Sequence, residues 1–297
     1  MSVVHLREKR ALTAQSFLRQ ASIEVMPRTA EKIADFRTLL PKSTRIYIAH
    51  IDGTAIEDMV ALAKRLGAQG FEVMPHIPAR VIPSDKALLD WVKRYRDVGV
   101  SSALVLGGAP VVPNGPFESA IQLLETGVFT DHGFGRLHIA GHPEGNRDIE
   151  SDGKTVITDE ALRWKAAFAH QSSVDMAIVT QFVFDAAPLI SWAERLQHLG
   201  VNLPIHAGIA GPAKLQTLIK YAIACGVGPS LKVLKSRAKD ISQLVRPHEP
   251  TEMVSQLATY INSTPNSAIS ALHLFPLGGI AKSASLIQNG ASSRTVA

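Results

Sequence analysis

Polar side chains suited to acid–base chemistry interrupt or end several short apolar runs of this chain. Glu24 lies between Ile23 and Val25, and Gln181 lies at the end of the run Met176 to Phe182. A carboxyl group inside an apolar strand is costly to bury, so we expect a raised pKa that suits a proton donor. The structural alternatives are a buried ion pair for Glu24 and capping of backbone groups at the strand end for Gln181.

Three histidines, His50, His76 and His142, also lie at the ends of such runs. Neutral imidazole nitrogen can ligate zinc, and it can equally hydrogen bond to flavin or phosphate oxygens. No carboxylate-rich spacing accompanies the three histidines, so we predict no metal site. The pair Gly107-Gly108 follows another run, where missing side chains let a ligand approach the backbone.

Several reaction classes lack their motifs. The chain has no Gly-x-Gly-x-x-Gly segment opening a helix, no Walker-type loop and no Gly-x-Ser-x-Gly elbow. No lysine ends one of the apolar runs, which disfavours Schiff-base chemistry. A dinucleotide would therefore have to bind on loops rather than in a Rossmann crevice.

Composition narrows the class of protein further. The net charge of +5 comes from scattered residues and forms no basic stripe, so we predict no nucleic-acid partner. Without an apolar segment of membrane-spanning length, and with a charged N-terminus, a cytoplasmic protein is expected. The single cysteine, Cys225, excludes an internal disulfide, and its apolar neighbours predict a packed side chain.

Strand-like runs alternate with segments of helical period through most of the chain. The runs are Ser22 to Pro27, Arg45 to His50, Gly70 to Ile77, Ser102 to Gly108, Arg136 to His142, Met176 to Phe182, Leu203 to Ile209 and Ala271 to Leu277. The helical segments are Ala30 to Leu40, Ala55 to Leu66, Asp85 to Tyr95, Pro116 to Thr126, Asp159 to His170, Ala187 to Leu199, Pro212 to Ala224 and Ala281 to Gln288. This rhythm predicts an α/β fold, a (β/α)8 TIM barrel, in which strand ends carry the chemistry.

The predicted organisation is one barrel domain over residues 1–297. A lead-in helix is expected over residues 1–20 and a disordered tail over residues 290–297. Extra helices are expected between strands 7 and 8, near Ser230 to Leu244 and Pro250 to Asn262. The charged segment Gly145 to Thr158 has the length of a loop that covers a barrel mouth.

From about Ser22 to Gln288 the chain resembles the methylenetetrahydrofolate reductase family, in particular its bacterial FAD-dependent type. Six segments, of which Thr180 to Asp185 is the most specific, carry the resemblance: Ser22 to Arg28, Pro75 to Pro78, His142 to Asn146, Thr180 to Asp185, Ala207 to Gly211 and His273 to Gly279. The resemblance implies a flavoenzyme that interconverts 5,10-methylenetetrahydrofolate and 5-methyltetrahydrofolate, and a possible homo-oligomer.

The resemblance also implies roles for single residues. Glu24 would protonate the folate, Gln181 with Phe182 would contact the folate above the flavin, and Tyr221 would stack on a substrate ring. For Tyr221 the alternative is a core residue of a helix face. The residues implied for FAD are Ala49, His50, His76, Gly107, Gly108, Ala109, His142, Asn146, Arg163 and Lys165.

Three positions depart from the family pattern. Ala49, Ala109 and Gly279 replace a flavin-binding threonine, an aspartate near the flavin and an arginine associated with the pyridine nucleotide. Loss of the aspartate should ease flavin reduction, and loss of the arginine leaves NADH or another electron donor open. Two alternatives therefore stand beside the flavoenzyme: a barrel lyase or hydrolase without flavin, and a folate- or flavin-binding partner subunit without reductase activity of its own.

Overall fold

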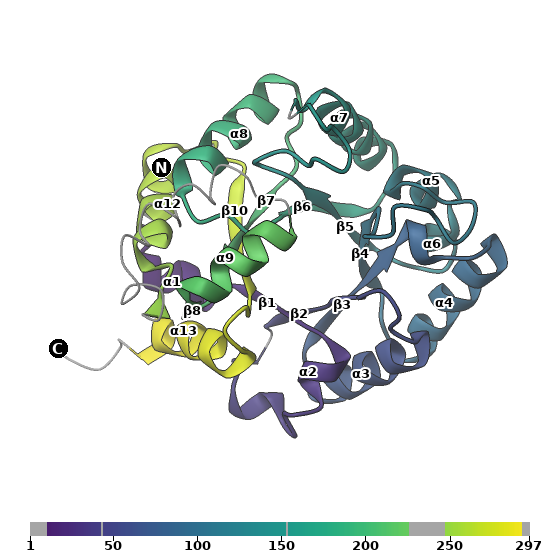
Figure 1. Cartoon of the computed structure of the whole chain (residues 1–297), viewed down its shortest axis with the longest axis horizontal. Coiled ribbons are helices and arrows are strands. Elements are labelled where there is room, and N and C mark those ends of the chain that lie inside the picture. Colours follow the sequence, from purple (N-terminus) through teal and green to yellow (C-terminus); the bar gives the residue numbers. More distant parts are fainter. Residues whose placement is uncertain (1–10, 43, 153, 226–246, 293–297) are drawn as a thin grey trace, which may run out of the picture.

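Eight parallel strands close into a barrel in this computed structural model, which describes residues 11–42, 44–152, 154–225 and 247–292. The order around the barrel is β1-β10-β7-β6-β5-β4-β3-β2, and helices surround it on the outside (Figure 1). Every neighbouring pair in the barrel is parallel, which requires crossover connections. The predicted (β/α)8 TIM barrel is confirmed.

Each barrel strand alternates between a face that packs on helices and a face that lines the interior. On β1 the outward residues Ile23 and Val25 are buried in the main apolar cluster, while Ser22 and Glu24 turn into the barrel. The barrel strands are β1 (Ser22–Val25), β2 (Arg45–Ile48), β3 (Glu72–Pro78), β4 (Ser102–Leu106), β5 (Arg136–Gly141), β6 (Asp175–Thr180), β7 (Ile205–Ala210) and β10 (Ile269–Phe275).

The helices bury apolar residues in the main cluster around the barrel, except the helix over residues 215–224, which buries its own in a smaller cluster. They are α1 (Ala14–Arg19), α2 (Pro27–Ala30), α3 (Ile56–Ala68), α4 (Asp85–Asp97), α5 (Ala120–Glu125), α6 (Val128–Asp131), α7 (Val156–Gln171), α8 (Ala186–His198), α9 (Leu215–Ala224), α12 (Thr251–Ser263) and α13 (Ile280–Ser292). Two short 3-10 helices, η1 (Phe36–Thr38) and η2 (Ala79–Val81), lie in loops. Within the ranges that the structure describes, none of the helices could span a membrane.

The helix predicted over Ala30 to Leu40 is wrong. Helix α2 begins earlier, at Pro27, and ends at Ala30, and only the short η1 follows. Side chains of α3 replace the missing helical hydrogen bonds, because Arg65 donates to the Ala30 carbonyl at 2.9 Å and Gln69 accepts from the Phe36 backbone at 3.0 Å. These partners lie more than 30 residues away along the chain, so a local pattern could not reveal them.

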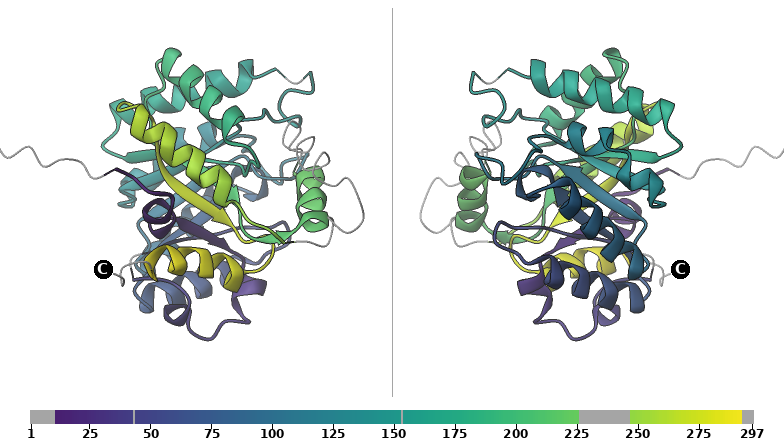
Figure 2. Two further views of the ribbon diagram at one scale, coloured as in Figure 1. Left: turned by 90° about the vertical axis from the view of Figure 1, so that its left-hand side faces the viewer. Right: turned by 90° about the vertical axis from the view of Figure 1, so that its right-hand side faces the viewer.

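The interval between β7 and β10 holds α9, α12 and a small antiparallel pair, β8 (Ala213–Lys214) with β9 (Pro247–His248). The helix expected near Pro250 to Asn262 is present as α12, and the one expected near Ser230 to Leu244 lies outside the described residues. Figures 1 and 2 show α9 at the end of the barrel where the strands terminate, which we call the mouth.

Both chain ends differ in detail from expectation. The lead-in segment contains α1, whose Phe17 and Leu18 are buried and which packs on α12 and α13. At the other end α13 continues to Ser292, two residues beyond the predicted start of the tail at residue 290. Residues 293–297 lie outside the described ranges.

At the opposite end from the mouth, charged side chains from four strands pair with one another. Glu72 lies 3.1 Å from Arg45 and also pairs with Arg136, which in turn lies 2.7 Å from Asp175. We call these four residues the basal ring. Each carboxylate has a cationic partner at this end of the barrel, although buried Arg45 Nε contacts Glu72 without forming a hydrogen bond.

Candidate functional site

Glu24 forms the centre of a cluster near the mouth with two histidines from other strands. Its carboxyl Oε2 lies 3.4 Å from His76 Nε2 of β3 and 3.8 Å from His273 Nε2 of β10. Ser22, two residues earlier on β1, lies 2.9 Å from the other ring nitrogen of His273. These four residues are the acid cluster, and the structure therefore unites the predicted Glu24 and His76.

The pKa of Glu24 lies below the usual glutamate value, so the expected raised pKa is wrong. Burial does act to raise it, but the interaction with His273 and the electrostatic attraction of His76 and His273 outweigh burial. The neighbours of Glu24 along the chain, Ile23 and Val25, face away from the barrel interior. The residues that control the carboxyl arrive from β3 and β10.

His76 is neutral at neutral pH, because burial lowers its pKa to about 4 against the opposing pull of Glu24. Its Nε2 atom is buried and has no hydrogen-bond partner among the described residues, and the same holds for His273 Nε2. Buried nitrogens without a hydrogen-bond partner are rare in protein interiors. They mark sites where a bound molecule or an additional proton completes the hydrogen bonding.

A second layer of polar residues lies beneath the acid cluster and was not predicted. Tyr47 of β2 places its hydroxyl 2.6 Å from His138 Nδ1 of β5, and the His138 ring lies 4.9 Å from that of His206 on β7. The Tyr47 ring contacts the His273 ring edge-on at 4.5 Å. Most barrel interiors hold branched apolar side chains here. The period-two placement of His138 and His206 within apolar runs was the available signal.

Gln181 and His142 meet at the carboxyl ends of β6 and β5. The Gln181 side chain hydrogen bonds to His142 and acts to raise the His142 pKa, although burial, the larger effect, lowers that pKa to about 4. The Gln181 amide also donates to the Cys225 carbonyl oxygen at 2.9 Å, which ties the end of α9 to the mouth. Gln181 is therefore held between two partners above the barrel, so it is not a simple cap of its own strand.

Cys225 itself is exposed, so the packed side chain expected from its neighbours is wrong. It is the C-cap of α9, where the helix ends and the apolar face no longer continues. Although the residue as a whole is exposed, partial burial of the thiol raises the Cys225 pKa, and the Glu24 charge adds to that rise.

Helix α7 brings two of the predicted cofactor residues to different environments. Lys165 is 9% exposed, burial lowers its pKa to about 8, and its charge acts on His142. Arg163 is exposed on the same helix. In the loop before α7, the Asn146 side chain accepts from the Asp148 backbone at 2.9 Å and so shapes that loop. Only Lys165 of these three has a buried charge directed toward the mouth residues.

The remaining predicted cofactor residues follow β2 and β4. His50 stacks on Trp91 of α4, with ring centroids 5.4 Å apart, and neither of its ring nitrogens has a hydrogen-bond partner among the described residues. Ala49 is buried and donates its backbone N–H to Val25. These two positions thus offer one free imidazole and no side-chain hydroxyl.

The turn Gly107-Gly108-Ala109 has a structural reason for its second glycine. Gly108 has a φ of +94°, and a side chain there would meet Pro78 Cβ at 2.9 Å. A Cβ on Gly107 would make an ordinary contact with the Glu118 backbone oxygen at 3.9 Å, and Ala109 is exposed. The turn therefore leaves room for a ligand beside Gly107 but presents no side-chain polar group.

The two aromatic residues implied for substrate binding lie on opposite sides of α9. Phe182 is buried in a small apolar cluster beneath α9 and contacts Phe184 and Phe275. Tyr221 is 39% exposed on α9, so the alternative of a core residue is wrong for it. Tyr221 is free to contact a ligand, whereas Phe182 mainly supports the helix.

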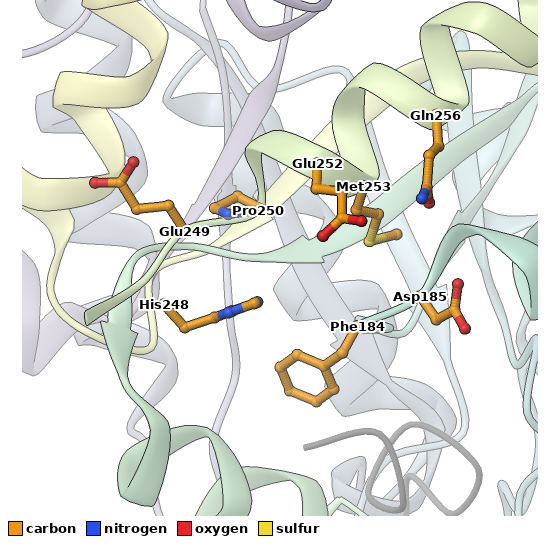
Figure 3. A pocket seen from close by; sticks show the side chains of 8 residues that line it. All are labelled: Phe184, Asp185, His248, Glu249, Pro250, Glu252, Met253 and Gln256. Carbon is orange, nitrogen blue, oxygen red and sulfur yellow. The ribbon is translucent and has the colours of Figure 1, made fainter. Parts of the chain in front are cut away.

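A separate acidic pocket lies beside the mouth, between the start of α8 and the start of α12 (Figure 3). Its polar lining includes the carboxylates of Asp185, Glu249 and Glu252 together with the His248 imidazole. None of the predicted site residues lines it. Such a pocket repels anionic ligands, so an anionic cofactor or folate would be attracted instead to the side of the mouth with Lys165.

The described parts of the chain hold no group of three or more histidine, cysteine, aspartate or glutamate side chains that could bind a metal ion. The groups available for chemistry at the mouth are thus a carboxyl, imidazoles, an amide and an ammonium. Together they can exchange protons and hydrogen bond to a polar, anionic ring compound.

Comparison with known proteins finds a similarity in sequence to a curated protein and similarities in fold to solved structures. No protein-family model matches the chain. The methylenetetrahydrofolate reductase (NADH) 1 of Arabidopsis thaliana is 26% identical over 249 residues, which cover 76% of this chain and 40% of the plant protein. The chain thus spans well under half the length of this curated relative.

Among solved structures, an uncharacterized protein from Clostridium thermocellum that binds two copies of 5-methyl-5,6,7,8-tetrahydrofolic acid superimposes with a TM-score of 0.59. It is 14% identical, and the match covers 93% of this chain and 97% of that one. The 7,8-dihydropteroate synthase of Vibrio fischeri ES114 gives a TM-score of 0.44 at 10% identity, over 94% and 96% of the two chains. At 14% identity the match to the Clostridium thermocellum protein supports the barrel fold alone.

Proposed function

We propose that this protein is a folate oxidoreductase that interconverts 5,10-methylenetetrahydrofolate and 5-methyltetrahydrofolate. The observation that carries the proposal is the Glu24 carboxyl, held between two imidazoles at the mouth of a barrel. The 26% identity to a methylenetetrahydrofolate reductase supports the choice of substrate. Because the chain corresponds to 40% of that relative, the electron donor and regulation of the plant protein are not carried over.

In this proposal Glu24 donates a proton to N10 of the folate. The C–N10 bond of the five-membered ring then breaks, and the one-carbon unit is left as an iminium on N5 that can accept a hydride. Gln181, fixed by His142, hydrogen bonds the folate, and exposed Tyr221 stacks on its aromatic part. General acid catalysis of this kind contributes about 10² to 10⁴ in rate.

The residues near the mouth are compatible with FAD, which when bound would supply the hydride. His50 has two unpartnered ring nitrogens, His142 Nδ1 is unpartnered, and Lys165 offers a buried positive charge. We propose these three residues as the main polar contacts of FAD. Ala49, Gly107, Gly108, Ala109, Asn146 and Arg163 would contribute backbone or peripheral contacts, and His76 would face both FAD and Glu24.

One observation favours a second candidate, a barrel enzyme that acts on the same scaffold without flavin. Ala49 and Ala109 present no polar side chain, and Gly108 is required by its backbone conformation and by the proximity of Pro78. The strand-end contacts to a flavin ring would then rest on backbone groups alone.

The visible absorption spectrum of the purified protein separates the two candidates. The flavoenzyme should be yellow, or should become yellow when FAD is added, and should bleach anaerobically with 5-methyltetrahydrofolate. NADH and NADPH, added one at a time, identify the donor. A protein that stays colourless after FAD addition yet converts methylenetetrahydrofolate would favour the second candidate. Failure to bind or convert either folate would overturn the proposed function.

A further inference from the structure

The last turn of α9 has little apolar support within the described residues. Earlier along the helix, Leu215 and Leu218 are buried in the small apolar cluster beneath it. In the last turn only Ala222 is buried, whereas its neighbours Tyr221 and Ile223 are 39% and 60% exposed. A buried alanine removes much less apolar surface from water than a buried leucine does, so packing holds this turn only weakly.

A hydrogen bond from the barrel supplies support at this point. Cys225 is the C-cap of α9, and the last carbonyl groups of a helix have no partner within the helix. Gln181 Nε2, directly after β6, donates to the Cys225 carbonyl oxygen at 2.9 Å. Because a carbonyl oxygen only accepts, the amide nitrogen and not the amide oxygen must face it. The orientation of the Gln181 side chain is therefore fixed by the end of α9.

The same turn connects this hydrogen bond to Tyr221. The Cys225 backbone N–H donates to the Tyr221 carbonyl oxygen at 2.9 Å, so two hydrogen bonds join the Gln181 side chain to the residue that carries the exposed ring. Gln181 also hydrogen bonds to His142, which follows β5, so its amide is held from two sides. Helix ends fray readily, and a partner for the last carbonyl group keeps the turn in its helical shape.

We infer that Gln181 is a positioning residue for Tyr221, because it caps the end of α9 and so fixes the tyrosine ring above the mouth. This role is additional to the proposed direct contact between Gln181 and the folate. That the ligand is a folate rests on the proposed function, whereas the cap itself does not. Loss of Gln181 should therefore weaken folate binding in two ways, through its own hydrogen bond and through the displaced Tyr221 ring.

The Cys225 thiol reports on the turn without any folate, because it belongs to the only cysteine of the chain. Partial burial raises its pKa, and the Glu24 charge adds to that rise. In Gln181→Met, which keeps the side-chain length but cannot donate, the turn should fray and the thiol should lose its burial. We expect its reaction with 5,5′-dithiobis(2-nitrobenzoate) at pH 8 to become roughly 2- to 12-fold faster, the equivalent of one hydrogen bond. The pH midpoint of the reaction rate should move downward.

Gln197→Met is the matched control. The Gln197 side chain also donates to a backbone carbonyl, that of Asn266 at 2.7 Å, but it joins the end of α8 to the segment before β10. The Cys225 reaction rate of this variant should equal that of the wild type. Gln181→Ala should reproduce the faster reaction, which excludes shielding of the thiol by the methionine side chain. A wild-type rate in both Gln181 variants, or an equal increase in Gln197→Met, would overturn the inference.

Folate affinity tests the effect on Tyr221. Calorimetry with 5-methyltetrahydrofolate compares the wild type, Gln181→Met, Tyr221→Ala and the double variant. In the wild type, Tyr221→Ala should weaken binding roughly 2- to 12-fold, as the loss of one ring stack does. In the Gln181→Met background the same substitution should weaken binding hardly further, because the effects of residues that depend on one another do not add. Strictly additive losses would show that Gln181 does not position the ring.

The two experiments fail separately. If 5-methyltetrahydrofolate does not bind at all, the proposed function falls, and the thiol reaction still decides whether Gln181 holds the last turn of α9. If the folate binds and the thiol reaction is unchanged in the Gln181 variants, the inference falls and the proposed function stands. Circular dichroism of each variant confirms that it is folded.

Discussion

The two ends of the barrel interior both hold charged side chains, but the partners of these side chains differ between the two ends. In the basal ring, Glu72 of β3 contacts arginines of β2 and β5, and Asp175 of β6 contacts the arginine of β5. In the acid cluster, one carboxyl faces two imidazoles, and both facing nitrogens lack hydrogen-bond partners among the described residues. At the basal end each carboxylate faces arginine, a permanent cation, whereas at the mouth the carboxyl faces imidazoles, whose charge depends on protonation.

This difference separates structural from functional charge. Opposite charges at the basal end pair with one another within the chain. Unpaired polar atoms at the mouth are tolerated only where something else completes them, either a proton or a bound molecule. Substitution of a barrel-strand glutamate is therefore expected to lower mainly turnover at the mouth, and mainly the free energy of unfolding at the basal end.

The largest expected effect is on turnover in Glu24→Gln. Removing the proton donor should lower folate turnover by about 10² to 10⁴, because that is the contribution of general acid catalysis. The matched control is Glu72→Gln, the same substitution in the basal ring, whose turnover per folded molecule should stay near that of the wild type. Equal losses of turnover in the two variants would contradict the proposed functional difference between the two ends of the barrel.

The buried histidines His138 and His206, which lie between the two ends of the barrel, should make the stability of the protein sensitive to acid. Burial lowers the pKa of His138 to about 2 and of His206 to about 3. The unfolded chain binds protons on both below about pH 6.5, so stability must fall as pH decreases below that value.

Between pH 7.5 and pH 5 this pair should cost about 2 to 4 kcal/mol in the free energy of unfolding, measured with urea at each pH. In His206→Gln one titrating ring is absent, so the loss should shrink by roughly 2 kcal/mol. A loss of stability on acidification that is the same in wild type and His206→Gln would show that His206 is not held neutral.

A smaller effect is expected on stability in Glu72→Gln. Losing the charge between two arginines should lower the free energy of unfolding by about 1 to 2 kcal/mol, since the network is partly exposed to solvent. The urea midpoint at pH 7.5 measures it. Glu24→Gln should lose less, because its partners are not satisfied in the wild type, and the reverse order would contradict the comparison.

The smallest effect is expected for Tyr221→Ala at the mouth. Loss of one ring stack should weaken folate binding by about 0.5 to 1.5 kcal/mol, or roughly 2- to 12-fold, measured by calorimetry. Because Tyr221 is 39% exposed, the melting temperature should hardly change. Tyr260→Ala, on α12, is the control, and equal effects on folate affinity would remove Tyr221 from the site.

Most of the barrel could be predicted from the chain, and its irregular parts could not. The alternation of apolar runs and helical segments identified the eight strands, since each strand repeats the same local pattern. The helix predicted after β1 was wrong because Arg65 and Gln69 of α3 supply the hydrogen bonds of that segment. The strands β8 and β9 are two residues long, too short for any pattern to show.

The candidate site was predicted in its members more than in its chemistry. Glu24, His76, His142 and Gln181 were all expected at strand ends, and the structure brings them to the mouth in two contacting pairs. His273 was noticed only within a family motif, and His138 and His206 were not singled out, because one histidine in an apolar strand has no distinguishing neighbour in the chain.

By itself the sequence determined the eight barrel strands and the polar residues near their ends, such as Glu24, His76, His142 and Gln181, because strands and helices repeat a local pattern. Only the tertiary structure decided what each side chain meets. The pKa of Glu24 falls, not rises, since His76 and His273 are 52 and 249 residues away in the chain but a few ångströms away in space. Electrostatic interactions depend on distance in space and on burial, and both are set by closure of the barrel.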